Sequence, residues 1–333
     1  MKVAHSKSVH VSRLFQCLRR IARLLKLNRV ILHICRLRAL TFRGALAMSA
    51  ARYRYLNRIL EAEPILAGMG MVEVHMLLHH KRIYEGIWSL YSFAHFCGRS
   101  CRIVIHDDGT LTESDVVALH RVFPQCQVID RRTADSVVLG YFHREGLSRC
   151  AQLRQNLIFA LKLFDPFFFL GSRYFILLDS DVLFFSRPNE LIDGLETIEE
   201  DKDLPNLYST DNGYRYCIDP TELASLIGKD CIERFNPGVL RVRRGTLNFQ
   251  RIEQYLQYPL FWAQNGTGNY YAELTLWAME LTIAGAHPLP DTYAICPSIH
   301  EPHLVSGHYC GGGYWKTLYY SQGLPSLVPI FIG

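Results

Sequence analysis

An unbroken apolar run, Tyr174–Leu178, is followed at once by Asp179-Ser180-Asp181 and then by four more apolar residues. A strand that is apolar on both faces is typical of a parallel sheet with helices on both sides. Residues i and i+2 of an extended chain point the same way, so we expect the two carboxylates to project together. In such a place two carboxylates are costly unless they are paired or bound to a cation.

Strand and helix patterns alternate before this run. Strand character covers residues 71–78, 102–106 and 127–129, and helical spacing covers residues 83–94, 112–122 and 153–164. This alternation predicts an α/β fold with a mostly parallel sheet flanked by helices, which we assign to residues 70–333. Ligands of such folds bind at the carboxyl ends of the strands.

The composition divides the chain into two parts. Of its 333 residues 49% are hydrophobic, which is enough for a full core and excludes a mainly disordered chain. Residues 1–60 contain 14 Lys and Arg and no Asp or Glu, whereas the remaining residues contain 22 basic and 31 acidic ones. We therefore expect a basic, partly helical appendage over residues 1–69 and an acidic body that does not bind nucleic acid.

The appendage contains a segment suited to a membrane surface. Residues 13–32 fit an amphipathic helix with leucine and isoleucine along one side and basic residues opposite, which is typical of contact with anionic lipid. The alternatives are a cationic leader without structure and a start of translation at a later methionine, Met48, Met69 or Met71. No apolar stretch has the length of a membrane span, and the ten scattered cysteines lack zinc-ligand spacing. We expect a cytoplasmic protein, with peripheral contact at the inner membrane surface as a further hypothesis.

Asp179 and Asp181 are the best candidates for metal ligands. Mn²⁺ and Mg²⁺ take carboxylate oxygens and keep positions for phosphate oxygens, which suits a nucleoside-diphosphate substrate. The Asp-x-Asp spacing alone is a weak signal, because Asp201-Lys202-Asp203 has it too, within an acidic loop. The buried strand before Asp179 distinguishes the two motifs.

Four segments, taken in order, carry a resemblance to a known family. They are Lys162 with the strand and Asp-x-Asp motif after it, residues 235–240 (FNPGVL), residues 271–277 (YAELTLW), and Gly307-His308-Tyr309 followed by Trp315-Lys316. Together they resemble the donor site of GT-A-fold glycosyltransferases, and they are most similar to the glycogenin and bacterial galactosyltransferase type. The resemblance implies a Rossmann-like sheet, a nucleotide-sugar donor, Mn²⁺ or Mg²⁺, and sugar transfer to an acceptor with retained anomeric configuration.

The resemblance also implies roles for single residues. His308 would join Asp179 and Asp181 as the third metal ligand, and Lys316 would contact the diphosphate. Glu273 would meet the acceptor or the reacting sugar, and Asn236 is the second catalytic candidate. The further donor-binding candidates are Asp135, for which a helix cap is the alternative, Arg154 and Lys162, which fall on one predicted helix, and Ser180.

The sequence departs from the family pattern at three places. Pro237 stands where a serine is usual, Leu274 replaces a glutamine, and Gly311–Gly313 lengthen the gap before Lys316. A non-catalytic GT-A-like protein that binds a glycan or a partner is therefore one alternative. A haloacid-dehalogenase-type phosphatase is another, because residues 106–111 (HDDGTL) are similar to its DxDGTL signature, although His106 stands at the position of the nucleophilic Asp.

Overall fold

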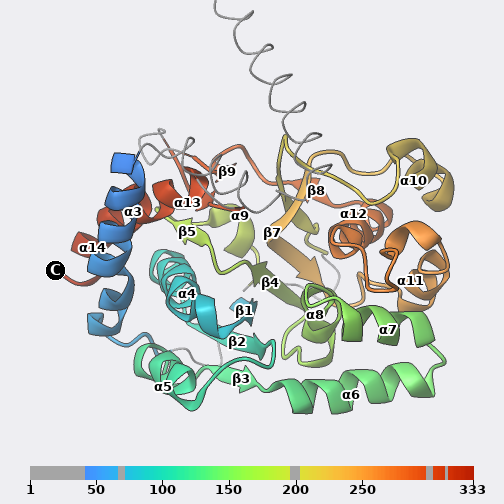
Figure 1. The fold of residues 1–333 in the computed structure, drawn as a ribbon, viewed down its shortest axis with the longest axis horizontal. Helices are drawn as coiled ribbons and strands as arrows, with labels where there is room; N and C mark the ends of the chain where they lie inside the picture. The colour runs from blue at the N-terminus through green and yellow to red at the C-terminus, as the bar shows by residue number, and fades with distance from the viewer. Residues whose placement is uncertain (1–41, 67–71, 196–202, 298–302, 312–313) are drawn as a thin grey trace, which may run out of the picture.

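The computed structural model describes residues 42–66, 72–195, 203–297, 303–311 and 314–333. A seven-stranded sheet runs through its centre in the order β3-β2-β1-β4-β7-β6-β8 (Figure 1). The strands are β1 (Val72–Leu78), β2 (Cys101–Asp107), β3 (Gln127–Ile129), β4 (Tyr174–Leu178), β6 (Leu207–Thr210), β7 (Phe235–Arg243) and β8 (His287–Pro288). Strands β3, β2, β1 and β4 are parallel, and only β7 runs against its neighbours β4 and β6. The predicted α/β fold with a mostly parallel sheet is confirmed.

Helices cover both faces of this sheet (Figure 1). One group packs in a core with Val74, Met76 and Ile176, and the other packs with Phe175 and Leu177. The first group contains α3 (Phe42–Tyr55), α4 (Ile83–Cys97), α5 (Glu113–Val122), α13 (Tyr314–Leu318) and α14 (Leu324–Phe331), and the second contains α6 (Arg131–Arg144), α7 (Ser148–Asn156), α8 (Ala160–Phe164), α10 (Pro220–Ile227), α11 (Phe249–Tyr255) and α12 (Ala272–Ile283). Because alternate residues of β4 enter the two cores, this strand is apolar throughout.

A second, three-stranded sheet lies at the carboxyl end of β4. It contains β5 (Val182–Phe184), β10 (Ser306–His308) and β9 (Tyr293–Ile295), in the order β5-β10-β9. Strand β10 is antiparallel to β5, with His308 opposite Val182, and the Tyr309 amide donates to the Asp181 carbonyl at 3.0 Å. The small sheet therefore carries a segment from near the end of the chain to the Asp-x-Asp loop.

Part of the segment assigned to the appendage packs on the body. The short helix Leu56–Glu61 buries Leu56 and Ile59 in the core, and the Trp88 indole donates to the Leu56 carbonyl at 2.8 Å. The expected amphipathic helix at residues 13–32 lies outside the described residues. Among the helices that the structure describes, none is long and apolar enough to span a membrane.

The single helix predicted over residues 153–164 is wrong, because two helices, α7 and α8, occupy this stretch. Leu157 separates them with an extended backbone (φ −130°, ψ 111°). Gly268 approaches so closely that a methyl group in place of its α-hydrogen would lie 2.7 Å from Leu153 and 2.9 Å from Leu157. A distant loop thus packs closely against the break between the two helices.

A polar network is buried under the same sheet. His75 lies between Glu73, at 2.7 Å, and His106, at 2.8 Å, and Arg102 and the Gly171 amide also bind Glu73. Burial raises the pKa of Glu73, but its bonds to His75 and these partners outweigh burial and lower the pKa to about 2. Burial lowers the pKa of His75, and lowers that of His106 further because His75 is close by.

We predict that this network makes the fold sensitive to mild acid. The folded protein keeps His75 and His106 neutral, whereas the unfolded chain takes up protons below a pKa of about 6.5. The stability that this network contributes should therefore be full above pH 6.5 and should fall below it by about 1.4 kcal/mol per pH unit for each such histidine. Urea unfolding at pH 7.5, 6.5 and 5.5 measures this fall.

The variant His106→Gln should show a shallower fall, and the exposed His143→Gln serves as the matched control with the wild-type slope. Equal slopes for wild type and His106→Gln would contradict the assignment.

Candidate functional site

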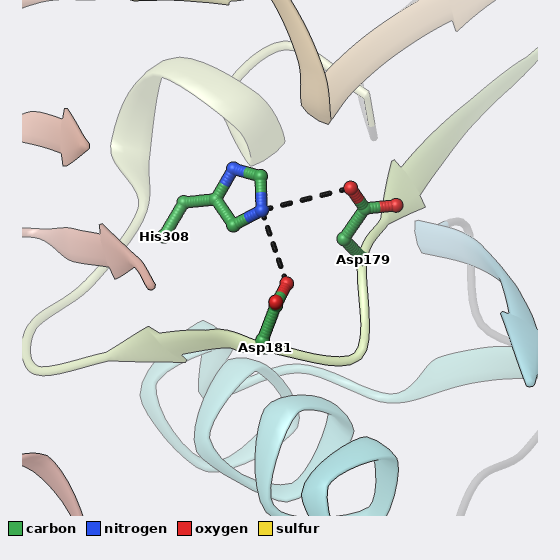
Figure 2. A group of neighbouring side chains, drawn as sticks. All are labelled: Asp179, Asp181 and His308. Carbon is green, nitrogen blue, oxygen red and sulfur yellow. Dashed lines mark ion pairs between the residues drawn. The ribbon is translucent and has the colours of Figure 1, made fainter. Parts of the chain in front are cut away.

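The Asp-x-Asp loop and the end of β10 bring three possible metal ligands together (Figure 2). His308 Nε2 lies 3.0 Å from Asp181 Oδ1 and 3.6 Å from Asp179 Oδ2. One ligand atom from each of the three residues lies within 4.8 Å of the other two. The predicted association of Asp179, Asp181 and His308 is thus present, although His308 follows Asp181 by more than 120 residues.

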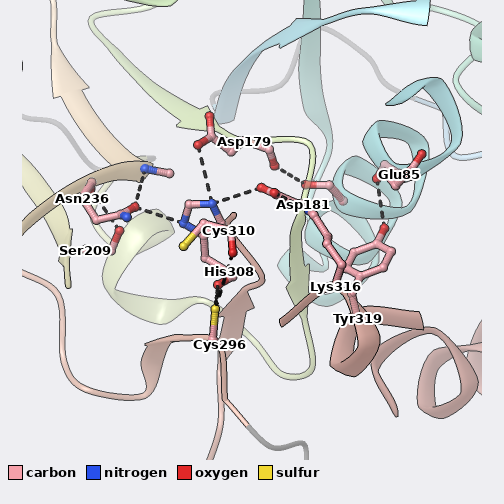
Figure 3. A network of polar contacts seen from close by, with 12 residues as sticks. Glu85, Asp179, Asp181, Ser209, Asn236, Cys296, His308, Cys310, Lys316 and Tyr319 are labelled. Carbon is pink, nitrogen blue, oxygen red and sulfur yellow. Dashed lines mark hydrogen bonds and ion pairs between the residues drawn. The ribbon is translucent and has the colours of Figure 1, made fainter. Parts of the chain in front are cut away.

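Two lysines bind the outer oxygens of these carboxylates. Lys162 Nζ donates to Asp179 Oδ1 at 2.8 Å. Lys316, which is labelled in Figure 3, donates from Nζ to Asp181 Oδ2. Both lysines are buried. The remaining oxygens, Asp179 Oδ2 and Asp181 Oδ1, are the ones nearest His308. Lys316 therefore reaches the site in spite of the longer glycine segment before it, of which residues 312–313 lie outside the described residues.

Asn236 fixes the orientation of the imidazole. Its Oδ1 accepts hydrogen bonds from the Gly238 amide at 2.8 Å and from His308 Nδ1 at 3.0 Å. The bond from the Gly238 amide identifies this Asn236 atom as the oxygen, which can only accept hydrogen bonds, so His308 Nδ1 must carry the hydrogen. The other ring nitrogen, Nε2, is then the atom directed to the carboxylates. Asn236, predicted as a catalytic residue, is thus placed where it orients His308.

Gly238 is a residue whose role the sequence did not reveal. A methyl group at its Cα would lie 2.2 Å from His308 Nδ1 and 2.9 Å from Asn236 Oδ1. The Gly238 carbonyl also accepts a hydrogen bond from the Asp179 amide at 2.9 Å. The missing side chain therefore lets the imidazole lie against β7 and beside the Asp-x-Asp loop.

The charges of the site shift the pKa values of its acids and bases. Burial lowers the pKa of His308, but the Asp181 carboxylate outweighs burial and raises it to about 9. Burial raises the pKa of Asp181, but His308 and Lys316 reverse this and hold it well below its usual range. Without a cation, a shared proton on Nε2 therefore holds His308 and Asp181 together.

The three ligands fit a divalent metal ion. Two carboxylate oxygens and one imidazole nitrogen are donors that Mn²⁺ accepts, and Mg²⁺ accepts the oxygens. Nε2 is free to bind a cation because Asn236 holds the opposite ring nitrogen, an arrangement common around metal-bound histidines. A cation at this point would take the place of the proton that Nε2 shares with Asp181.

A cavity of about 380 Å³ opens beside the two aspartates. Its walls come from the carboxyl ends of β1 and β4, which is where the sheet topology predicts a ligand. It is lined by Leu77, Leu78, His79, Arg82, Asp108, Ile158, Phe159, Lys162, Asp179, Ser180 and Asp181. Ser180 and Lys162, which were predicted to bind a donor, are among these residues, and so are Arg82 and Phe159, which were not predicted. Arg82 follows shortly after the first predicted strand, and this position could have indicated that it lies near a ligand site.

Glu273 lies behind Lys162, at the start of α12. Its Oε1 is 3.6 Å from Lys162 Nζ, and this buried oxygen has no hydrogen-bond partner among the described residues. Burial raises the pKa of Glu273 to about 7, although Lys162 opposes the shift. A carboxyl group with such a pKa can give or take a proton near neutral pH.

Arg154 and Asp135 form a separate cluster. The fully buried Arg154 guanidinium binds both oxygens of Asp165, at 2.6 and 2.8 Å, and also Asp135 at 2.5 Å. The α6 cap is Asp130, which accepts from the Arg132 and Thr133 amides, so the alternative of a cap at Asp135 is wrong. Neither Arg154 nor Asp135 lines the cavity beside the aspartates, and their binding to a donor remains a prediction.

The phosphatase-like motif is a structural turn. Asp107 Oδ1 accepts hydrogen bonds from the amides of Gly109, Thr110 and Leu111, and Gly109 has a φ of +98°. The carboxylate thus closes the turn that ends β2. His106, at the position of the nucleophile, is buried against His75. This geometry disfavours phosphatase chemistry at residues 106–111.

No protein-family model matches the chain, and no curated protein sequence matches it. Several solved structures are similar. The galactosyltransferase LgtC, in complex with donor and acceptor sugar analogs, is 14% identical over 79% of this chain and 97% of its own, with a TM-score of 0.44. Mouse xyloside xylosyltransferase 1 is 12% identical over 71% and 97%, with a TM-score of 0.47.

A third similar structure is a glycosyltransferase involved in the glycosylation of the major capsid of PBCV-1. It is 12% identical over 77% of this chain and 98% of its own, with a TM-score of 0.36. All three are glycosyltransferases. At this level of identity the similarity concerns the fold alone.

We predict that Gly238→Ala destroys the ligand geometry. The added methyl group would force His308 away from the aspartates, because the space it needs is occupied by the imidazole. Mn²⁺ affinity, measured by isothermal titration calorimetry, should fall at least about ten-fold, as removal of an outer-shell support does in metal sites.

Gly140→Ala in α6 is the matched control, since nothing lies within 4 Å of the added methyl group. It should leave Mn²⁺ affinity unchanged. Tight Mn²⁺ binding by Gly238→Ala would show that His308 is not a ligand.

Proposed function

We propose that this protein is a metal-dependent glycosyltransferase, which moves a sugar from a nucleoside-diphosphate donor to an acceptor. The observation that carries the proposal is the convergence of Asp179, Asp181 and His308 beside a cavity at the carboxyl end of the sheet. Lys162 and Lys316 add positive charge at the same point. Cations around a pair of acidic ligands suit a diphosphate that arrives together with a metal ion.

The chain's own residues would bind and orient the donor. A bound Mn²⁺ or Mg²⁺, held by Asp179, Asp181 and His308, would supply Lewis-acid stabilisation of the departing nucleoside diphosphate. Lys162 and Arg82, which line the cavity, and Lys316, which binds Asp181, would offset the remaining phosphate charge. His79 and Asp108 line the same cavity and offer polar contacts to the nucleoside.

Glu273 would act at the reacting sugar. It is buried next to Lys162, and its Oε1, 3.6 Å from the lysine Nζ, has no hydrogen-bond partner among the described residues. With a pKa near 7, it could accept a proton from an acceptor hydroxyl or hydrogen-bond the donor sugar. Retention of anomeric configuration is part of the proposal through the family resemblance alone.

The setting of the reaction is a further part of the proposal. The acceptor would be a glycan, a lipid or a protein, and the enzyme would work in the cytoplasm. Residues 13–32 would hold it peripherally at an anionic inner membrane surface. Deletion of residues 1–41 removes this segment but keeps α3, and it should abolish binding to liposomes that contain phosphatidylglycerol. Unchanged binding would exclude this role.

We predict metal-dependent stabilisation by one nucleoside diphosphate. Purified protein is heated with UDP, GDP, ADP or CDP, each with Mn²⁺ and with a chelator. A ligand at one hundred times its Kd stabilises the native state by about 2.7 kcal/mol, which corresponds to a rise in Tm of about 5 °C for a chain of this size.

Asp181→Ala should lose the rise, whereas the surface control Asp203→Ala should keep it. The corresponding nucleotide sugar should then be hydrolysed slowly by the wild type, with water as the acceptor. Stabilisation without any hydrolysis or transfer would favour the non-catalytic binding protein. A panel without any stabilising nucleotide would contradict the proposed function.

A further inference from the structure

Two cationic side chains line the cavity beside the aspartates, and they differ in what they bind. Lys162 already donates to Asp179 at 2.8 Å, whereas Arg82 has no ion pair with Asp179 or Asp181 among the described residues. The Arg82 side chain is 33% exposed, and both of its described side-chain hydrogen bonds are made by Nη1. Its Nε and Nη2 donors are therefore left for a ligand, and such a pair can bind an oxyanion through two parallel bonds.

Two buried side chains hold the other end of this guanidinium. Arg82 Nη1 donates to Glu85 Oε1 at 3.0 Å and to the Tyr320 hydroxyl oxygen at 3.4 Å. The Tyr320 hydroxyl in turn donates to Glu85 Oε1 at 2.5 Å, so the three side chains bond to one another in a closed triangle. Because Glu85 and Tyr320 are buried, water competes little for these bonds. The triangle therefore restricts the conformations that Arg82 can adopt.

The hydroxyl of Tyr320 keeps its hydrogen in this triangle. Burial and the adjacent Glu85 carboxylate raise the pKa of Tyr320 far above its usual range. The protonated hydroxyl can donate to the carboxylate while its oxygen accepts from Arg82. Tyr320 thus fixes the two charged groups relative to each other.

The segment that carries Tyr320 also reaches the metal site. Lys316, four residues earlier, donates to Asp181, and the Tyr319 hydroxyl donates to the Glu85 carbonyl at 3.4 Å. The chain continues from α13 into the π-helical turn Tyr319–Gly323, a rare conformation that is frequent at functional sites. One short segment therefore bonds to a metal-ligand candidate and to the network that holds Arg82.

We propose that Glu85 and Tyr320 are positioning residues, which hold Arg82 for a two-bond contact with a phosphate group of the nucleoside-diphosphate donor. The inference rests on the proposed function and extends it to residues that do not line the cavity. A free arginine side chain loses conformational entropy when it binds a ligand, and this loss is smaller when buried partners already restrict it. Removal of the Tyr320 hydroxyl should therefore weaken donor binding.

Isothermal titration calorimetry on the full chain tests the proposal. UDP, GDP, ADP and CDP are titrated in the presence of Mn²⁺, and the nucleotide that binds the wild type is then used for the variants. Tyr320→Phe removes only the hydroxyl and should raise the Kd about five-fold, an effect typical of one hydrogen bond. Arg82→Ala should raise the Kd at least about ten-fold, because hydrogen bonds between charged groups are stronger.

Two further variants distinguish positioning from a general structural effect. Tyr91→Phe is the matched control, since it also removes a buried hydroxyl, which donates to the Glu63 carbonyl at 3.0 Å, and it should keep the wild-type Kd. When Arg82 is already alanine, the additional change Tyr320→Phe should leave the Kd unchanged, because the hydroxyl acts through the guanidinium alone.

Three results would overturn the positioning role while nucleotide binding by the wild type still supports the proposed function. They are a wild-type Kd in Tyr320→Phe, a wild-type Kd in Arg82→Ala, and a five-fold effect of Tyr320→Phe that persists without Arg82. If the wild type binds none of the four nucleotides, the proposed function is contradicted, and the inference that rests on it is overturned as well.

Discussion

Two carboxylates at the end of a buried strand constrain the rest of this structure. Asp179 and Asp181 carry negative charge at the edge of the core, and such charges persist only with partners. Those partners come from distant parts of the chain: Lys162 from α8, Lys316 from α13 and His308 from β10. The electrostatic requirement of one loop therefore explains why these segments meet there.

The small sheet and Gly238 fix the position of His308 relative to the two aspartates. Pairing of β10 with β5 sets the height of His308 above the loop, and Asn236 sets the rotation of its ring. Gly238 provides the space in which the imidazole lies. Each contact acts on a different degree of freedom, so the ligand geometry is built before a cation arrives.

Local sequence patterns were sufficient to predict part of this structure. The alternating strands and helices, the buried strand before Asp179 and the metal-ligand set are all present as the sequence indicates. Features that depend on packing between distant segments could not be predicted from the sequence. Gly268 packs against Leu157 at the break after α7, Arg154 binds Asp165, and the exposure of Tyr270 is a property of the folded surface. The spacing of residues in the sequence indicates none of these three features.

The central claim is that Asp179, Asp181 and His308 bind one metal ion together with a nucleoside diphosphate. A crystal structure of the full chain soaked with MnCl₂ and UDP, with data collected at the manganese absorption edge, tests it most directly. We expect one anomalous peak at about 2.0–2.3 Å from an oxygen of each aspartate and from His308 Nε2, with phosphate oxygens on its open side. Two results would contradict the account. One is a nucleotide bound elsewhere, and the other is the absence of an anomalous peak between Asp179, Asp181 and His308 at a saturating manganese concentration.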